Sequence, residues 1–539
     1  MCTCLIAGRK ATKTGKAILA ANDDWEGCPG VLTHVAGVQH APGEMQILTG
    51  GQQIPQVRET CGYVYTACDY AVGTLDRAWA GGMNDCGVAV AGTGVDAYRL
   101  LSWKQGDRKE QWTPDWKTEG YLLEPDDIPL LVLQRGTSAR QAVRMIGDLI
   151  NQYGLRPSYV EGASGSSAAT FSIADCQEGW VLEVYPGRCW VAVRVPDDCV
   201  SVRVNAFGTH DADLTDYDNT MSSPGLAAYA RERGLWDGDE RHFDFAAAFG
   251  SATSPTEWGT EKDSMNLRRR WRAMYLVDGK EEPEETLRYL ARPADRAVPP
   301  KEAQQAHGTE REKTALSLRE STREAEEQPA KTAGNERWKR SVEDMMTILS
   351  DVYDNTPYDL RNVPEAGPVH DPFADGMPDY ALCRQYTLAS FVTDYIGEKK
   401  EPLMWTAMGI PRLVPYIPVW VDIDKLPECC GKGNEVGSKA GEMSLYEEMK
   451  RFCLHVRRSY DQNAEAATKR KKAYHAYMLE KIREEASETE EKIREEVSET
   501  AENPEQPDHG RRNRTAADSA HIQSALKICR NIMAKEAEE

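Results

Sequence analysis

The second residue of the chain is a cysteine whose position could give it unusual chemistry. The chain opens with "MCTCLIAG", and removal of Met1 would leave Cys2 with a thiol and a free α-amine in the same residue. An α-amine has a pKa of about 7.7–8.0, so near neutral pH it can accept the proton of a thiol. The resulting thiolate is the form that attacks carbonyl groups. Because 14 of the 539 residues are cysteine, position alone leaves chance as the alternative.

Three polar residues follow the second apolar segment. "KAILAANDDW" ends in Asn22, Asp23 and Asp24 where we expect a strand to leave a sheet. A carboxylate there could orient the α-amine of Cys2, although Asn-Asp-Asp is also a common turn. Serine is a poor alternative nucleophile, because "EGASGSSAA" lacks a Gly-x-Ser-x-Gly elbow. We expect no metal or cofactor, since His-Glu-x-x-His and Cys-x-x-Cys patterns are missing.

Several blocks of the sequence resemble one known family. "MCTCLIAGRKATKTGKAILAANDDW" is similar to the start of the N-terminal-cysteine dipeptidases of the dipeptidase A type. These belong, with cholylglycine hydrolases and penicillin V acylases, to the N-terminal-nucleophile hydrolases. "GGMNDCGVAVAGTGV", "EGWVLEVYPGRCWVAVRVPDDCVSVRVNAFG" and "MWTAMGIPRLVPYIPVW" resemble further family blocks in the expected order. The resemblance covers most of residues 2–280 and 340–425.

The resemblance implies a fold and a set of site residues. The fold class is α+β, a four-layer αββα sandwich. Cys2 would be the nucleophile, and Asp24 would orient its amine. Asn84 in "MND" matches the asparagine of an oxyanion hole, and Asn205 in "VNAF" matches a second active-site asparagine. Arg269 in "NLRRRW" matches an arginine that completes the site, with no cofactor and no metal.

Each assignment has an alternative. Asparagine favours bends, so Asn84 and Asn205 could be turn residues. The arginine could be Arg270, or Arg269 could belong to a solvated basic face. Many relatives carry a basic residue where this chain has Ala21, so another cation would have to stabilise the thiolate.

The elements that must position these residues are mostly short strands. β-type segments separated by Gly, Pro and Asp fill the first part of the chain. One helix is expected up to Gly154, and an antiparallel meander is expected in "ATFSIADCQEGWVLEVYPGRCWVAVRV". We expect a hydrolase domain in two parts, residues 2–280 and 338–462. A charged insertion, residues 281–337, separates the two parts, and a charged helical tail follows at residues 463–539.

The tail contains a duplication. "KIREEASETEE" (481–491) is followed at once by "KIREEVSETAE" (492–502), and an 11-residue apolar period would favour a right-handed supercoil. The two copies carry few apolar residues, however, which favours a solvated helix over a coiled-coil partner site. A last helix through "HIQSALKICRNIM" carries an apolar stripe that could dock on the body or on another subunit.

Composition limits the partners. A formal net charge of −21 argues against nucleic acid and anionic membranes, and no apolar run spans a bilayer. Without an export signal, we expect a cytoplasmic protein with free thiols, as a possible homo-oligomer. The sequence therefore predicts a cysteine dipeptidase acting on small peptides. The alternatives are an N-acyl amide amidase of the bile-salt or penicillin V type, or a catalytically silent interaction protein.

Overall fold

The protein is represented by a computed structural model that describes most of the chain. The described residues are 2–26, 29–68, 78–95, 120–156, 168–250, 261–278, 339–378, 381–398, 400–431, 443–499 and 509–535. The predicted insertion, residues 281–337, lies outside them. None of the helices among the described residues has both the length and the apolar character of a membrane-spanning segment.

The first strand of the chain lies inside a six-stranded antiparallel sheet. Its order is β14-β1-β2-β16-β17-β18, so β1 is covered by a neighbour on each side. The strands are β1 (Thr3–Ala7), β2 (Ile18–Asp24), β14 (Val200–Arg203), β16 (Thr387–Ile396), β17 (Glu401–Met408) and β18 (Ile417–Trp420). Residues 3–7 are all buried, which suits a strand with both faces covered.

A second antiparallel sheet has eight strands in the order β15-β13-β12-β11-β10-β9-β8-β3. They are β3 (Gly30–Val35), β8 (Tyr63–Cys68), β9 (Ala78–Asn84), β10 (Ala89–Val95), β11 (Ala168–Ala174), β12 (Gly179–Tyr185), β13 (Cys189–Val195) and β15 (Thr220–Ser222). The pairing of β11, β12 and β13 confirms the predicted meander. Two small ribbons accompany it, formed by β4 (Val38–Gln39) with β7 (Glu59–Thr60) and by β5 (Met45–Ile47) with β6 (Gln53–Pro55).

The two sheets pack face to face. Ile6 of β1 and Val181 of β12 belong to the same buried apolar cluster. The sheets approach closely at Gly179, where an added Cβ would lie 2.3 Å from Cγ2 of Ile6. Glycine is therefore needed at this position, since any side chain would push the two sheets apart.

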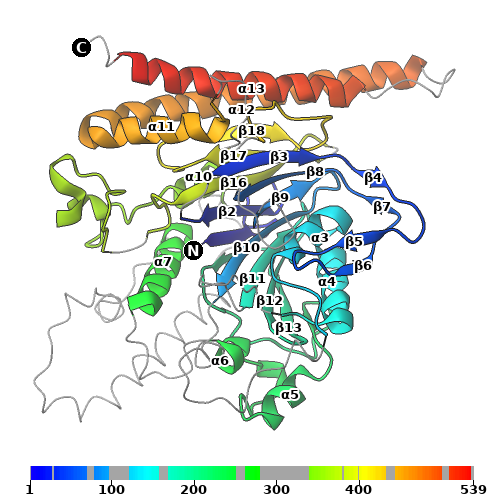
Figure 1. Cartoon of the computed structure of the whole chain (residues 1–539). Coiled ribbons are helices and arrows are strands. Elements are labelled where there is room, and N and C mark those ends of the chain that lie inside the picture. The colour runs from blue at the N-terminus through cyan, green and yellow to red at the C-terminus, as the bar shows by residue number, and fades with distance from the viewer. Residues whose placement is uncertain are drawn as a thin grey trace, which may run out of the picture.

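Helices cover the outer face of each sheet (Figure 1). On the eight-stranded sheet lie α3 (Asp127–Arg135) and α4 (Ala139–Tyr153). The expected helix up to Gly154 is confirmed: the Ser138 side chain accepts a hydrogen bond from the Gln141 amide, and Gly154 has a φ of 67°. The six-stranded sheet is covered by α7 (Glu261–Asp278), α10 (Val342–Leu349), α11 (Leu445–Arg458) and α13 (His509–Lys535). The layers are αββα, as predicted.

Short helices complete the described elements. They are α5 (Leu226–Glu232), α6 (Phe245–Phe249), and the 3-10 turns Glu240–His242, Leu360–Asn362 and Pro364–Val369. Helices α5 and α6 pack their aromatic and apolar side chains under the lower end of the eight-stranded sheet (Figure 1).

The charged tail is part of the body. Helix α12 (Tyr460–Glu499) begins before the predicted boundary at residue 463, and α13 follows beside it (Figure 1). Asp518 of α13 accepts a hydrogen bond of 3.0 Å from the amide of Trp420, the last residue of β18. Ile482, from the first copy of the duplication, is 1% exposed, so this face is not solvated as expected. The predicted last helix therefore docks on the body of the same chain.

The docking of α13 can be tested through its apolar stripe. Leu526 is 3% exposed, so Leu526→Ala should lower the free energy of unfolding by about 2–5 kcal/mol, because it leaves a cavity against the body. Gln523→Ala on the exposed side of the same helix is the control. Urea denaturation measures both. Equal stability of the two variants would show that α13 contributes no packing energy.

Candidate active site

Pairing of β1 with β2 carries Cys2 to the end of the second strand. Thr3 lies opposite Asn22, so the residue before Thr3 reaches the start of the Asp23–Asp24 pair. The Sγ atom of Cys2 donates a hydrogen bond of 3.3 Å to Oδ1 of Asp23. The two segments that the sequence singled out therefore meet because neighbouring antiparallel strands bring the start of one to the end of the other.

The thiol of Cys2 is held in its neutral form while Met1 is attached. Desolvation in the surrounding protein raises the pKa of the thiol to about 12, with smaller contributions from the negative charges of Asp23 and Asp24, although the positive charge of the amino terminus lowers it. A neutral thiol is a weak nucleophile. Cys2 therefore needs a base that removes its proton during the reaction.

Asp23 is a carboxylate with a raised pKa. Desolvation, with a smaller contribution from the charge of Asp24, raises its pKa from 3.8 to about 6, although the hydrogen bond from Cys2 and the positive charge of the amino terminus act in the opposite direction. A carboxylate that is poorly solvated gains more than a solvated one when a positive amine comes close. Asp23 is thus suited to hold a positive charge on the amine of Cys2. The sequence named Asp23 as part of the triplet but assigned the role to Asp24.

Asp24 is buried and anchored from a distant part of the chain. Its Oδ1 atom accepts a hydrogen bond of 2.6 Å from the hydroxyl of Thr387 on β16. Nη1 of Arg384 lies 3.8 Å from its Oδ2 atom. Sequence reasoning missed Arg384, which precedes β16 by three residues and carries no local signal. The charge of Arg384 lies close to Asp24, at the end of β2. Many relatives carry a basic residue earlier in this strand, at the position of Ala21.

Arg269 joins the start of the chain to α7. Its Nη1 atom donates to the main-chain oxygen of Cys2 at 3.1 Å, and Nη2 donates to Oδ1 of Asn205 at 2.9 Å. The side chain is fully buried, and desolvation together with the nearby charge of Arg384 lowers its pKa to about 10. It remains protonated at neutral pH. The geometry places Arg269 at the main chain of Cys2, and its part in the reaction stays a prediction.

Asn205 and Asn266 complete this network. The Nδ2 atom of Asn205 donates to the carbonyl of Gly94 at 2.8 Å, and its main-chain oxygen accepts from Nδ2 of Asn266 at 3.2 Å. Oδ1 of Asn266 accepts from Nη2 of Arg269 at 2.5 Å. Asn266 was missed, although its spacing of three residues from Arg269 places both side chains on one face of α7.

The structure does not bring Asn84 into this network. Its Nδ2 atom donates to the carbonyls of Leu133 and Gly136 at 3.0 and 2.7 Å, and its Oδ1 accepts from the amide of Val88 at 2.8 Å. These bonds tie the turn after β9 to the end of α3. Both N–H groups and the oxygen are engaged, so in this structure Asn84 has a structural role in place of the predicted donor role.

The arrangement can support nucleophilic catalysis by Cys2. A thiol, two carboxylates and two arginines meet at the end of one sheet, with Asn205 linked to them. Among the described residues, the donor groups able to hold a metal ion are Cys61, Asp85 and Cys86. None of these three residues belongs to the group around Cys2. In the described part of the chain, Cys68 at the end of β8 is disulfide-bonded, which differs from the expectation of free thiols throughout.

Comparison with known proteins defines the class. The profile of peptidase family C69 matches residues 1–473, so this chain belongs to that family of peptide-bond hydrolases. The family predicted from the opening residues and the ordered blocks is thereby confirmed.

Individual relatives agree with this assignment. The chain is 30% identical over 249 residues to a "Probable dipeptidase" from Salmonella dublin, which covers 46% of this chain and 53% of the relative. It is 24% identical over 443 residues to a "Probable dipeptidase" from Latilactobacillus sakei, which covers 79% and 75%. The match thus spans about half the length of the Salmonella protein and three quarters of the other.

Solved structures with detectable similarity are more distant. A penicillin V acylase from Agrobacterium tumefaciens is 13% identical with a TM-score of 0.34, covering 78% of this chain and 86% of the acylase. A conjugated bile acid hydrolase from Clostridium perfringens is 13% identical with a TM-score of 0.27, covering 55% and 82%.

The raised pKa of Asp23 predicts a gain in stability when its charge is removed. Because the folded pKa of about 6 exceeds the ordinary 3.8, the contribution of this group to stability is full below pH 3.8 and is lost as pH rises through 6. In the chain that retains Met1, Asp23→Asn should therefore raise the free energy of unfolding at pH 7, by up to about 3 kcal/mol, and by much less at pH 4.

Urea denaturation of the wild type and the variant at both pH values measures this difference. Glu26→Gln, at an exposed carboxylate close by in the chain, is the control and should change little. A variant that is less stable than the wild type at pH 7 would contradict a raised pKa of Asp23.

Proposed function

We propose that the protein is a cysteine dipeptidase that hydrolyses its substrate through a thioester on Cys2 after Met1 has been removed. One observation carries the proposal: the thiol of Cys2 contacts Asp23 at 3.3 Å, and the main-chain carbonyl of Cys2 accepts a hydrogen bond from Arg269 at 3.1 Å. Membership of peptidase family C69 supports the reaction class. The names of the Salmonella and Latilactobacillus relatives support a dipeptide substrate.

Activation begins at the amine of Cys2. Once Met1 is gone, this amine lies on Cα, next to the Cβ atom that bears the thiol, and takes up the thiol proton as a general base. The ammonium group that forms is stabilised by the carboxylates of Asp23 and Asp24. Arg269 keeps the main chain of Cys2 in place through its carbonyl, which makes it a positioning residue.

The thiolate attacks the carbonyl carbon of the scissile amide, and a C–S bond forms while the carbonyl oxygen becomes negative. Asn205, linked to the main chain of Cys2 through Arg269, is the side chain that we propose as donor to that oxygen. Its amide group carries two N–H bonds, of which one is used by the carbonyl of Gly94. The second has no partner among the described residues, and the side chain is only half buried.

The intermediate then collapses. The C–N bond of the substrate breaks, the ammonium of Cys2 returns a proton to the departing amine, and the acyl group remains on the sulfur as a thioester. The free amine of Cys2 next removes a proton from water, which attacks the thioester and releases the carboxylic acid and the thiol. No cofactor enters either half of the reaction.

Cys2→Ala should abolish hydrolysis. Alanine is small enough to leave removal of Met1 unchanged, but it has no sulfur to form the thioester. The assay follows release of free amino acids from dipeptides, and intact mass of each protein shows whether Met1 is absent. Cys176→Ser, at another partly exposed cysteine, is the control and should keep full activity.

Wild-type activity in Cys2→Ala would rule out the proposed nucleophile, as would a wild-type enzyme that is active with Met1 retained. Parallel assays with N-acyl amino acids address the amidase alternative. A dipeptidase cleaves the dipeptides faster, whereas the reverse preference would move the substrate to acyl amides without changing the nucleophile.

Asn205 and Asn84 should respond differently to truncation. Asn205→Ala should lower kcat by about 10²–10³, the usual cost of losing an oxyanion donor. Asn84→Ala should instead lower stability, by about 1–3 kcal/mol, because buried carbonyls at the end of α3 lose their donors. Steady-state kinetics and urea denaturation separate the two effects. A large loss of kcat in a stable Asn84→Ala protein would restore the role that the sequence assigned to Asn84.

A further inference from the structure

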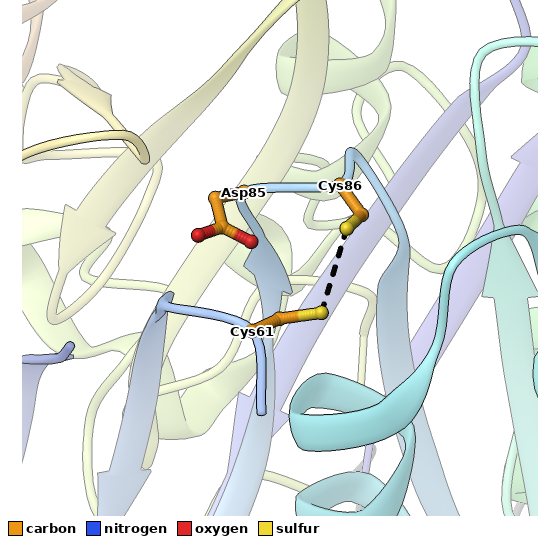
Figure 2. Close-up of side chains that lie close together, drawn as sticks. All are labelled: Cys61, Asp85 and Cys86. Carbon is orange, nitrogen blue, oxygen red and sulfur yellow. Dashed lines mark hydrogen bonds between the residues drawn. The ribbon is translucent and has the colours of Figure 1, made fainter. Parts of the chain in front are cut away.

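Two cysteines and an aspartate meet at the open end of the β8–β9 pair (Figure 2). The Sγ atoms of Cys61 and Cys86 are 3.4 Å apart, and one ligand atom from each of Cys61, Asp85 and Cys86 lies within 4.8 Å of the others. We propose that these three side chains form a binding site for a thiophilic divalent cation, Zn²⁺ above all. The site is separate from Cys2 and does not depend on the proposed function.

The spacing of the donor atoms suits such an ion. Zn–S bonds are about 2.3 Å and Zn–O bonds about 2.0–2.2 Å, so two sulfurs on one tetrahedral ion lie roughly 3.7 Å apart. The observed sulfur pair needs to open by only a few tenths of an ångström. Two sulfur ligands and one carboxylate favour Zn²⁺ over Mg²⁺ or Ca²⁺, which prefer oxygen.

The main chain holds the donors in place. The amide of Asp85 donates to the carbonyl of Gly62 at 2.8 Å, and Oδ2 of Asp85 accepts from the amide of Gly62 at 2.9 Å. The amide of Cys61 donates to the carbonyl of Gln134 at 2.9 Å. The side chain of Asn84 anchors the turn that carries Cys86. Donors fixed in this way pay little ordering entropy when an ion binds.

The ion can reach the site and keep a fourth ligand. The three side chains line a cavity of about 660 Å³, and Cys86 is exposed. Glu59 and Asp422 line the same cavity and add negative charge. Arg135 also lines it, but its Nη2 atom donates to the carbonyl of Pro55 and to Gln56. Binding would displace the two thiol protons, form two Zn–S bonds and one Zn–O bond, and leave a position for water.

Titration of the reduced, metal-free full-length protein with Cd²⁺ tests the site through the thiolate-to-cadmium charge-transfer absorption. The expected result is one ion per chain, displaced by Zn²⁺. Cys61→Ser and Cys86→Ser should each abolish this band, and Asp85→Asn should weaken binding. Cys429→Ser is a matched control, because Cys429 is also a partly buried cysteine next to another, Cys430, and it should retain the band.

A second readout follows folding. Zn²⁺ should raise the Tm of the wild type and of Cys429→Ser, but not that of Cys86→Ser, because an ion that binds only the folded state stabilises it. Circular dichroism confirms that each variant is folded. The proposal is overturned if the band persists in Cys61→Ser and Cys86→Ser, if the wild type binds no ion, or if Cys61 and Cys86 are joined by a disulfide in reducing buffer.

Discussion

The structure depends on the burial of the first strand. Residues 3–7 pair with β2 on one side and with β14 on the other, so the start of the chain enters the sheet at once. A terminus is ordinarily the least ordered part of a domain. Here Cys2 is fixed by the strand that follows it and by the guanidinium of Arg269 on its carbonyl. Cys2, the nucleophile that we propose, is therefore as well positioned as a residue in the middle of a strand.

Burial at this position imposes an electrostatic balance. Asp23 and Asp24 bring two negative charges to the end of β2, and Arg269 and Arg384 bring two positive ones. A buried charge without a partner is strongly unfavourable. The pairing is incomplete, because the pKa of Asp23 is raised and that of Arg269 is lowered. Asp23 thus remains a carboxylate whose charge is unfavourable in the folded state, even with the positive amino terminus close by.

Different helices cover the two sheets. Helices α3 and α4 close the outer face of the eight-stranded sheet, and Asn84 fastens the end of α3 to the turn after β9. On the other side, α13 contacts β18, the edge strand of the six-stranded sheet, through Asp518 and the amide of Trp420. Covering an edge strand prevents its free amides and carbonyls from pairing with another chain. The charged tail therefore contributes to the body that supports Cys2.

The sequence by itself determined much of this protein. Met-Cys at the start, the Asn-Asp-Asp triplet, the helix ending at Gly154 and the meander all depend on local patterns of polarity and turn residues, which act over a few positions. Together with the resemblance of the ordered blocks, they were enough for the family, the layered fold and the contact between Cys2 and its neighbours on β2.

Only the tertiary structure decided which distant groups complete the site. Arg384 is 360 residues from Asp24 in the chain. Asn266 reaches the main chain of Asn205 only because α7 packs beside β14. The matching motif around Asn84 gave no hint that the side chain points to the end of α3. A motif records residue types in order, whereas the direction of a side chain depends on which layer packs against its strand. For the same reason, the meeting of Cys61 with Cys86 could not be read from two isolated cysteines.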